Sequence, residues 1–271
     1  MNGAFMKQIL AFGDSNTWGL IPGTWDRYPE HVRWTGILRK AVLPLGCRII
    51  EDGVCGRTTV FEDPARPLRK GIDSIPQYKD TEGLHTVILM LGTNDCKKAL
   101  RAAPEQIGCG LEQCIKRFEA FLSPERILVV SPLLLGPDVW KPEKDPAFDA
   151  VSIETCAKLK DVYQAIAQRR GNSFLAASDY AQASPVDDEH LNAEGHEHLA
   201  EAIIQKVRQL IRSAAQANLA TPYPPLNNFK AEPLRVRLFV YILELSEQNE
   251  IYILLNWNIK KRFYYLNLMN S

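Results

Sequence analysis

The stretch Ile9–Gly19, which reads ILAFGDSNTWG, decides the fold prediction for this chain. Its first four residues are apolar, as in a buried β-strand, and the apolar run stops at Gly13 and Asp14. Open α/β sheets bind ligands outside the carboxyl ends of their strands. The sequence therefore predicts that Ser15 lies at such an end, where its hydroxyl is a candidate nucleophile.

Alternating strands and helices are predicted on both sides of that stretch. Residues 86–91 are continuously apolar, which is typical of a strand buried on both faces of a parallel sheet. Strands separated by helices favour parallel βαβ units. We predict an α/β fold: a flavodoxin-like, three-layer α/β/α sandwich with a central five-stranded parallel sheet. The predicted strands span 7–12, 48–51, 86–91, 126–131 and 173–176, and the predicted helices span 33–43, 71–78, 104–122, 148–170 and 193–211.

Composition excludes several classes of partner. Lys plus Arg and Asp plus Glu both number 32, so the formal charge is zero and no net field attracts nucleic acid or an anionic membrane. We see neither a secretory signal nor a long apolar run, which predicts a cytoplasmic protein with no membrane partner. The six cysteines form no CxxC pair and are expected to be free thiols.

The chain is predicted to divide into a domain over residues 6–213 and a tail over 214–271. The tail changes abruptly to a sequence rich in Asn, Ile, Leu and Tyr after the prolines at 222–225. It has no domain-sized pattern. A strand-rich or helical appendage, an oligomer contact and a non-native extension are all open alternatives.

Four short motifs follow predicted strands or precede the last predicted helix. They are Gly13-Asp14-Ser15-Asn16, Gly56 within 54–59, Gly92-Thr93-Asn94-Asp95 and Asp187-Asp188-Glu189-His190. Their order and spacing over residues 7–211 resemble the sequence blocks of the SGNH (GDSL-type) hydrolase superfamily. The variant Gly-Asp-Ser-Asn-Thr-Trp-Gly resembles its arylesterase and acyltransferase branch, although most members have Leu where this chain has Asn16.

These residue types suit nucleophilic catalysis. A serine hydroxyl is a weak nucleophile until a base takes its proton, and His190 titrates near neutral pH. Asp187, three residues earlier, can orient the other ring nitrogen of His190. The resemblance further implies an oxyanion hole made of the N–H groups of Ser15 and Gly56 and the side-chain amide of Asn94.

The sequence thus predicts a serine esterase without cofactor or metal. Its expected substrates are small short-chain aryl or acetyl esters, hydrolysed through an acyl-serine intermediate, with acyl transfer to alcohols as an additional activity. A carbohydrate acetylesterase or a thioesterase on the same triad is an alternative. Two other classes stay open: a non-catalytic binding protein of the same fold, and a metal-dependent hydrolase using His190, Glu194, His196 and His198.

Other residues carry weaker expectations. Asn16 and Trp18 are predicted to shape the substrate pocket, with packing in the first helix as the alternative for Trp18. Asp14 and Asp95 are expected to cap helices or tie loops. Arg57 either steers an anionic substrate or pairs with a carboxylate. The long loops at 19–31 and 133–146 could shape the pocket and support a homo-oligomer.

Overall fold

The computed structural model describes residues 6–220, 239–244, 251–257 and 262–266. Contacts divide the chain into two units, Met1–Ala220 and Thr221–Ser271. The first unit contains the predicted α/β fold and all the candidate site residues. All six cysteines also lie in it, and all are free thiols, as predicted.

The five predicted strands form one sheet, in the order β2-β1-β3-β4-β5, and every neighbouring pair is parallel. This is the flavodoxin-like strand order. In this order the ligand crevice lies between the carboxyl ends of β1 and β3, because the chain leaves these two strands toward opposite sides of the sheet. Ser15 follows β1 and Asn94 follows β3, so both flank that point. The strands are β1 (Lys7–Gly13), β2 (Cys47–Gly53), β3 (Leu84–Met90), β4 (Ile127–Ser131) and β5 (Ser173–Ala176).

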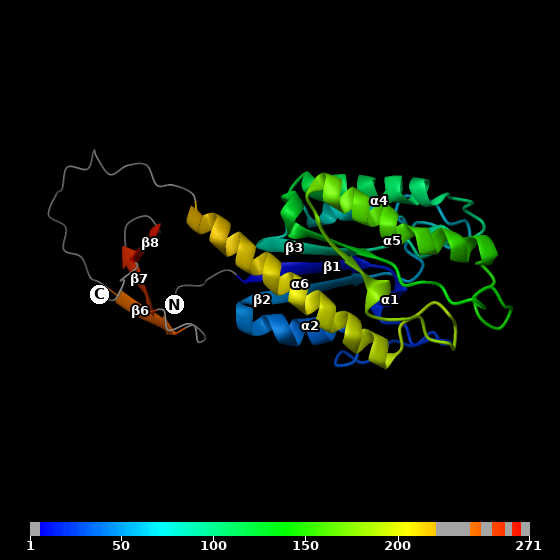
Figure 1. Cartoon of the computed structure of the whole chain (residues 1–271), viewed down its shortest axis with the longest axis horizontal. Helices are drawn as coiled ribbons and strands as arrows, with labels where there is room; N and C mark the ends of the chain where they lie inside the picture. Colours follow the sequence, from blue (N-terminus) through cyan, green and yellow to red (C-terminus); the bar gives the residue numbers. More distant parts are fainter. Residues whose placement is uncertain (1–5, 221–238, 245–250, 258–261, 267–271) are drawn as a thin grey trace. The chain divides into compact units, whose positions relative to one another are not determined.

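Helices cover both faces of the sheet, which confirms the three-layer prediction (Figure 1). Because successive side chains of a strand point to opposite faces, Ile9 and Ala11 join one core while Leu10 and Phe12 join the other. The first core is closed by α2 (Trp34–Val42) and α6 (Ala193–Ala220), and the second by α4 (Pro104–Glu119) and α5 (Ala150–Arg170).

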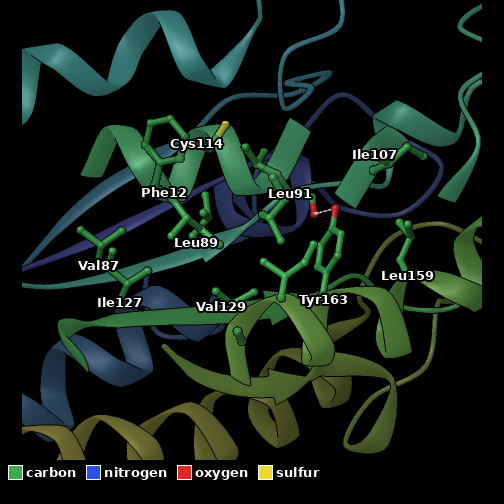
Figure 2. Packing of buried hydrophobic residues seen from close by; sticks show 14 of the residues in the cluster. Phe12, Val87, Leu89, Leu91, Ile107, Cys114, Ile127, Val129, Leu159 and Tyr163 are labelled. Atoms are coloured by element: carbon green, nitrogen blue, oxygen red, sulfur yellow. Dashed lines mark hydrogen bonds between the residues drawn. The ribbon is translucent and has the colours of Figure 1, made fainter. Parts of the chain in front are cut away.

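The second core also fixes the end of β3. Figure 2 shows Tyr163 of α5 donating from its hydroxyl to the carbonyl oxygen of Leu91, at 3.1 Å. The next residue, Gly92, has φ +129°, and a Cβ there would lie 2.4 Å from that hydroxyl oxygen. Only glycine fits this position. The core therefore sets the path of the chain into Asn94.

Two predicted helices differ from those observed. The helix predicted over 71–78 is split into α3 (Gly71–Ser74) and a 3-10 helix at Ile75–Tyr78, because Pro76 has no N–H to continue the α-helical ladder. The last helix, predicted to end at Ile211, continues to Ala220. Residues 212–220 contain no glycine or proline and four alanines, which favours a helix.

The second unit has three described strands: β6 (Phe239–Glu244), β7 (Ile251–Trp257) and β8 (Arg262–Leu266). They pair antiparallel in the order β6-β7-β8. Among the alternatives for the tail, these strands fit a strand-rich appendage. The rest of the tail lies outside the described residues.

Candidate active site

Ser15 begins the one-turn helix α1 (Ser15–Trp18), directly after β1. The carboxylate of Asp14 caps this helix by accepting from the N–H of Asn16 at 3.0 Å, as predicted for Asp14. The side chain of Ser15 is buried and lines a cavity. Because Ser15 is the first residue of the helix, its own N–H has no acceptor within the helix.

His190 lies beside Ser15, although 175 residues separate them in the chain. The Nε2 atom of His190 is 2.8 Å from the hydroxyl oxygen of Ser15, and its Nδ1 atom is 2.9 Å from Oδ2 of Asp187. An ionised carboxylate only accepts hydrogen bonds, so Nδ1 carries a proton. In neutral His190, Nε2 is then an acceptor for the hydroxyl proton of Ser15.

Asp187 is held as an ionised group. Its carboxylate also accepts from the N–H groups of Gly23, Glu189 and His190, at 3.0, 3.1 and 3.0 Å. Burial opposes ionisation, but the hydrogen bond and the charge of His190, together with the backbone donors, outweigh it and lower the pKa of Asp187. The carboxylate is therefore available to fix the tautomer and orientation of His190.

The three predicted oxyanion donors line the same cavity as His190. Gly56 lies in a turn closed by a 3.0 Å bond from the N–H of Arg57 to the carbonyl oxygen of Val54. Its φ of +82° favours glycine, and its N–H has no acceptor in the described part of the chain. The side-chain amide of Asn94 donates to the carbonyl oxygen of Arg57 at 3.2 Å, which holds Asn94 against this turn.

Asp95 ties two of the site loops together, as predicted. Its buried carboxylate accepts from the N–H of Thr59 at 2.9 Å and from the hydroxyl of Thr59 at 2.5 Å. These bonds join the loop after β3 to the loop after β2. Asn94 and Gly56 are therefore fixed relative to each other.

Arg57 pairs with a carboxylate, which was one of its two predicted alternatives. Its guanidinium is buried, lies 2.8 Å from the carboxylate of Asp52, and donates to the carbonyl oxygens of Gly13 and Asp52. It also stacks over the ring of Phe12, 4.2 Å from the centroid. Arg57 thus ties the loop after β2 to the carboxyl ends of β1 and β2, and it is absent from the cavity lining.

Asn16 and Trp18, which were predicted to shape the substrate pocket, are not among the residues that line this cavity. The side chain of Asn16 donates to the carbonyl oxygen of Glu189 at 3.3 Å and accepts from the N–H of Leu191 at 2.9 Å. It joins the serine loop to the histidine loop. Trp18 packs under Arg27, whose guanidinium lies 5.4 Å from the ring centroid.

The cavity has a volume of about 380 Å³ and a strongly charged lining. The loops at 19–31 and 133–146 both contribute to it, as predicted. Apart from Asp187, its charged residues were not predicted from the sequence; they are Arg66, Lys97, Glu143, Lys144, Asp145 and Glu189. Only Glu189 carried a signal in the sequence, because it stands between Asp187 and His190.

The histidines of the metal alternative do not converge. His196 is buried in the core, where its Nδ1 accepts from the N–H of Trp34 at 3.4 Å, whereas His198 is exposed. Burial, with the nearby charge of Arg33, lowers the pKa of His196 to about 4. In the ranges that the structure describes, no group of three His, Cys, Asp or Glu side chains is arranged to hold a metal ion.

A serine, a histidine and an aspartate hydrogen-bonded in a row at the carboxyl edge of a parallel sheet form the arrangement used by nucleophilic hydrolases. The model of the GDSL-like lipase/acylhydrolase family matches residues 11–198 of this chain. The chain belongs to this family, and it is an ester hydrolase of the SGNH type.

Two solved structures illustrate the likeness. An aryl esterase from M. smegmatis is 31% identical, with a TM-score of 0.69 and an alignment that covers 75% of this chain and 99% of that one. A carbohydrate acetylesterase from Sinorhizobium meliloti is 33% identical, with a TM-score of 0.68 and coverage of 75% and 99%. A search of curated protein sequences gave no match. No described helix is long and apolar enough to cross a bilayer.

Proposed function

We propose that this protein is a serine esterase that hydrolyses short-chain carboxylic esters through an acyl-serine intermediate. The observation that carries the proposal is the hydrogen-bonded row from Ser15 through His190 to Asp187, with both contacts to the imidazole at 2.8–2.9 Å. A row of this kind activates a serine hydroxyl, because the base is in contact with the proton it takes.

In the acylation step, the hydroxyl oxygen of Ser15 attacks the carbonyl carbon of the ester while His190 Nε2 takes the hydroxyl proton. The negative charge that forms on the carbonyl oxygen is stabilised by the N–H groups of Ser15 and Gly56 and by the amide of Asn94. The bond to the alcohol oxygen then breaks. That oxygen receives the proton from Nε2, and the alcohol leaves.

In the deacylation step, water attacks the acyl carbon and gives a proton to His190 Nε2. The bond between the acyl carbon and the oxygen of Ser15 breaks, and Nε2 returns the proton to that oxygen as the acid leaves. Asp187 stabilises the imidazolium in both steps. An alcohol that takes the place of water gives acyl transfer.

The charged lining of the cavity supports a second candidate within the same chemistry. Arg66, Lys97 and Lys144 supply hydrogen-bond donors, and the exposed ring of Trp25 lies under the guanidinium of Arg66, 5.1 Å from it. Hydroxyl-rich alcohols use such donors and an aromatic surface better than plain alkyl groups do. Deacetylation of carbohydrate esters is therefore the alternative to hydrolysis of aryl esters.

The test compares purified wild type, Ser15→Ala and the distant control Ser123→Ala on a 4-nitrophenyl acetate and an acetylated sugar. We expect Ser15→Ala to lower kcat by at least about 10³-fold and Ser123→Ala to leave it unchanged. The better of the two substrates by kcat/KM then decides between the two candidates. Full activity of Ser15→Ala on both substrates would refute the serine mechanism.

A further inference from the structure

Glu189 is a buried carboxyl group that faces the catalytic cavity. Its side chain is only 6% exposed, and its Oε1 atom lies 3.8 Å from Nε2 of His190. Its main chain is fully used, since the N–H donates to Asp187 and the carbonyl oxygen accepts from Asn16. The carboxylate itself has no hydrogen-bond partner among the described residues. The mechanism above assigns it no role.

His190 therefore has a carboxylate near each ring nitrogen. Asp187 is bonded to Nδ1, and Glu189 approaches Nε2, the atom that exchanges the proton with Ser15. An imidazolium at this position is attracted from both sides, and the His190 and Glu189 side chains are both largely buried, which strengthens the attraction.

Other charged groups face this pair from the surrounding elements. Asp14, from the turn after β1, adds attraction for a proton on His190, and Asp145, from the loop before α5, opposes ionisation of Glu189. Lys97, from the loop after β3, favours ionised Glu189, but it is also bonded to Asp63 at 2.9 Å. His196 also feels the charge of His190, which helps to keep His196 neutral.

These charges shift the pKa values of both His190 and Glu189. Burial alone would lower the pKa of His190, but Glu189 is the largest opposing influence, and with Asp187 it raises this pKa to about 9. Burial raises the pKa of Glu189 to about 7, against the attraction of His190.

We propose that Glu189 is a positioning residue that holds the imidazolium of His190 and thereby moves esterase activity to alkaline pH. The inference rests on the proposed function, because His190 must be the base that Ser15 needs. As Glu189 ionises near neutral pH, its charge keeps the proton on Nε2, and the protonated ring cannot accept from Ser15. Activity rises only as His190 loses this proton.

The experiment measures the pH dependence of kcat/KM for 4-nitrophenyl acetate between about pH 5 and 10, in wild type and Glu189→Gln. We expect an alkaline midpoint for wild type. In Glu189→Gln we expect the midpoint to fall by about one pH unit or more, so that activity at pH 7 increases several-fold. A merely structural role for Glu189 predicts only a loss of activity at every pH.

Glu143→Gln is the matched control, because Glu143 lines the same cavity but is exposed and is not among the charges that act on His190. Its midpoint should equal that of wild type. If Glu189→Gln does not fold, as judged by circular dichroism, Glu189→Met tests the same loss of charge with a similar volume. NMR titration of the His190 ring in wild type gives a readout independent of activity.

The outcomes separate the two proposals. If Ser15→Ala retains activity, the proposed function fails. If activity depends on Ser15 but the midpoint of the charge-removing variant equals that of wild type, only the role of Glu189 is refuted. A His190 that titrates at or below its ordinary range in the NMR experiment would likewise refute it.

Discussion

Two loops at the carboxyl edge of the sheet each bury a carboxyl group, and they use it in opposite ways. In the loop after β3, Asp95 is bonded by the N–H and the hydroxyl of Thr59. In the loop before α6, the carboxylate of Glu189 has no hydrogen-bond partner in the part of the chain that the structure describes, and it faces the cavity and His190. Burial raises the pKa of both groups, to about 6 for Asp95 and about 7 for Glu189.

The difference shows why a shifted pKa alone does not identify a functional group. The carboxylate of Asp95 accepts hydrogen bonds from fixed donors of Thr59, and in this way it holds two loops together. The carboxylate of Glu189 has unused acceptor capacity beside the base, so its charge acts on the chemistry. Perturbed groups cluster at active sites for both reasons.

The largest expected effect on kcat comes from Asp187, the carboxylate that is hydrogen-bonded to His190. Asp187→Asn should lower kcat by about 10³–10⁴-fold, because an amide that donates to Nδ1 stabilises the wrong tautomer of His190. Asp188→Asn is the matched control one residue away, since Asp188 pairs with Lys144 at 2.7 Å rather than with His190. Equal kcat values for the two variants in steady-state assays would contradict the role of Asp187.

The next largest effect on kcat is expected for Asn94, the proposed oxyanion donor in the loop after β3. Asn94→Ala should lower kcat by about 10²–10³-fold with little change in KM, because the lost amide acts mainly on the charge of the transition state. Thermal unfolding checks that the variant folds. A kcat within about threefold of wild type would remove Asn94 from the oxyanion hole.

Asp95→Asn should mainly change stability. The amide keeps one acceptor but loses the charge on the bonds from Thr59, so the free energy of unfolding should fall by about 1–3 kcal/mol. Denaturant titration of Asp95→Asn, Thr59→Val and the double variant measures the coupling. Additive effects would show that the two side chains do not interact and that the loops are held in another way.

Glu189→Gln should have the smallest effect on stability. A folded-state pKa raised from 4.5 to about 7 means that Glu189 disfavours folding as pH rises through this window, and the penalty is complete above pH 7. The variant loses this penalty, but it also loses the attraction between Glu189 and the His190 imidazolium, so at pH 8 its stability should stay within about 1 kcal/mol of wild type. A large destabilisation in urea titrations would mean that the carboxylate has a structural partner.

The sequence predicted the architecture well, and it named residues that the structure brings together at the candidate site, for physical reasons. Buried parallel strands are continuously apolar, so the sequence alone indicated a strand at 86–91 and the end of the first strand near Gly13. The carboxyl ends of parallel strands meet at one edge, which brought Ser15, Gly56 and Asn94 together. Pro76 split one short predicted helix, and the last helix extended beyond its predicted end, but neither change altered the order of the elements.

Orientation of side chains was less predictable. Trp18 follows Ser15 by three residues, but the single turn of α1 directs it toward Arg27 instead of the cavity. The side chain of Asn16 makes its hydrogen bonds to the main chain of the histidine loop, which is distant in sequence. Glu189 could be noticed in the motif, but its burial and its approach to Nε2 depend on how that loop packs against the rest of the fold.

Covalent trapping tests the serine mechanism most directly. A fluorophosphonate should inactivate the enzyme, and mass spectrometry of the digested protein should locate the phosphonyl group on Ser15 alone, with Ser15→Ala unlabelled. An active enzyme that resists the probe, or a label on another residue that accompanies the loss of activity, would contradict Ser15 as the nucleophile.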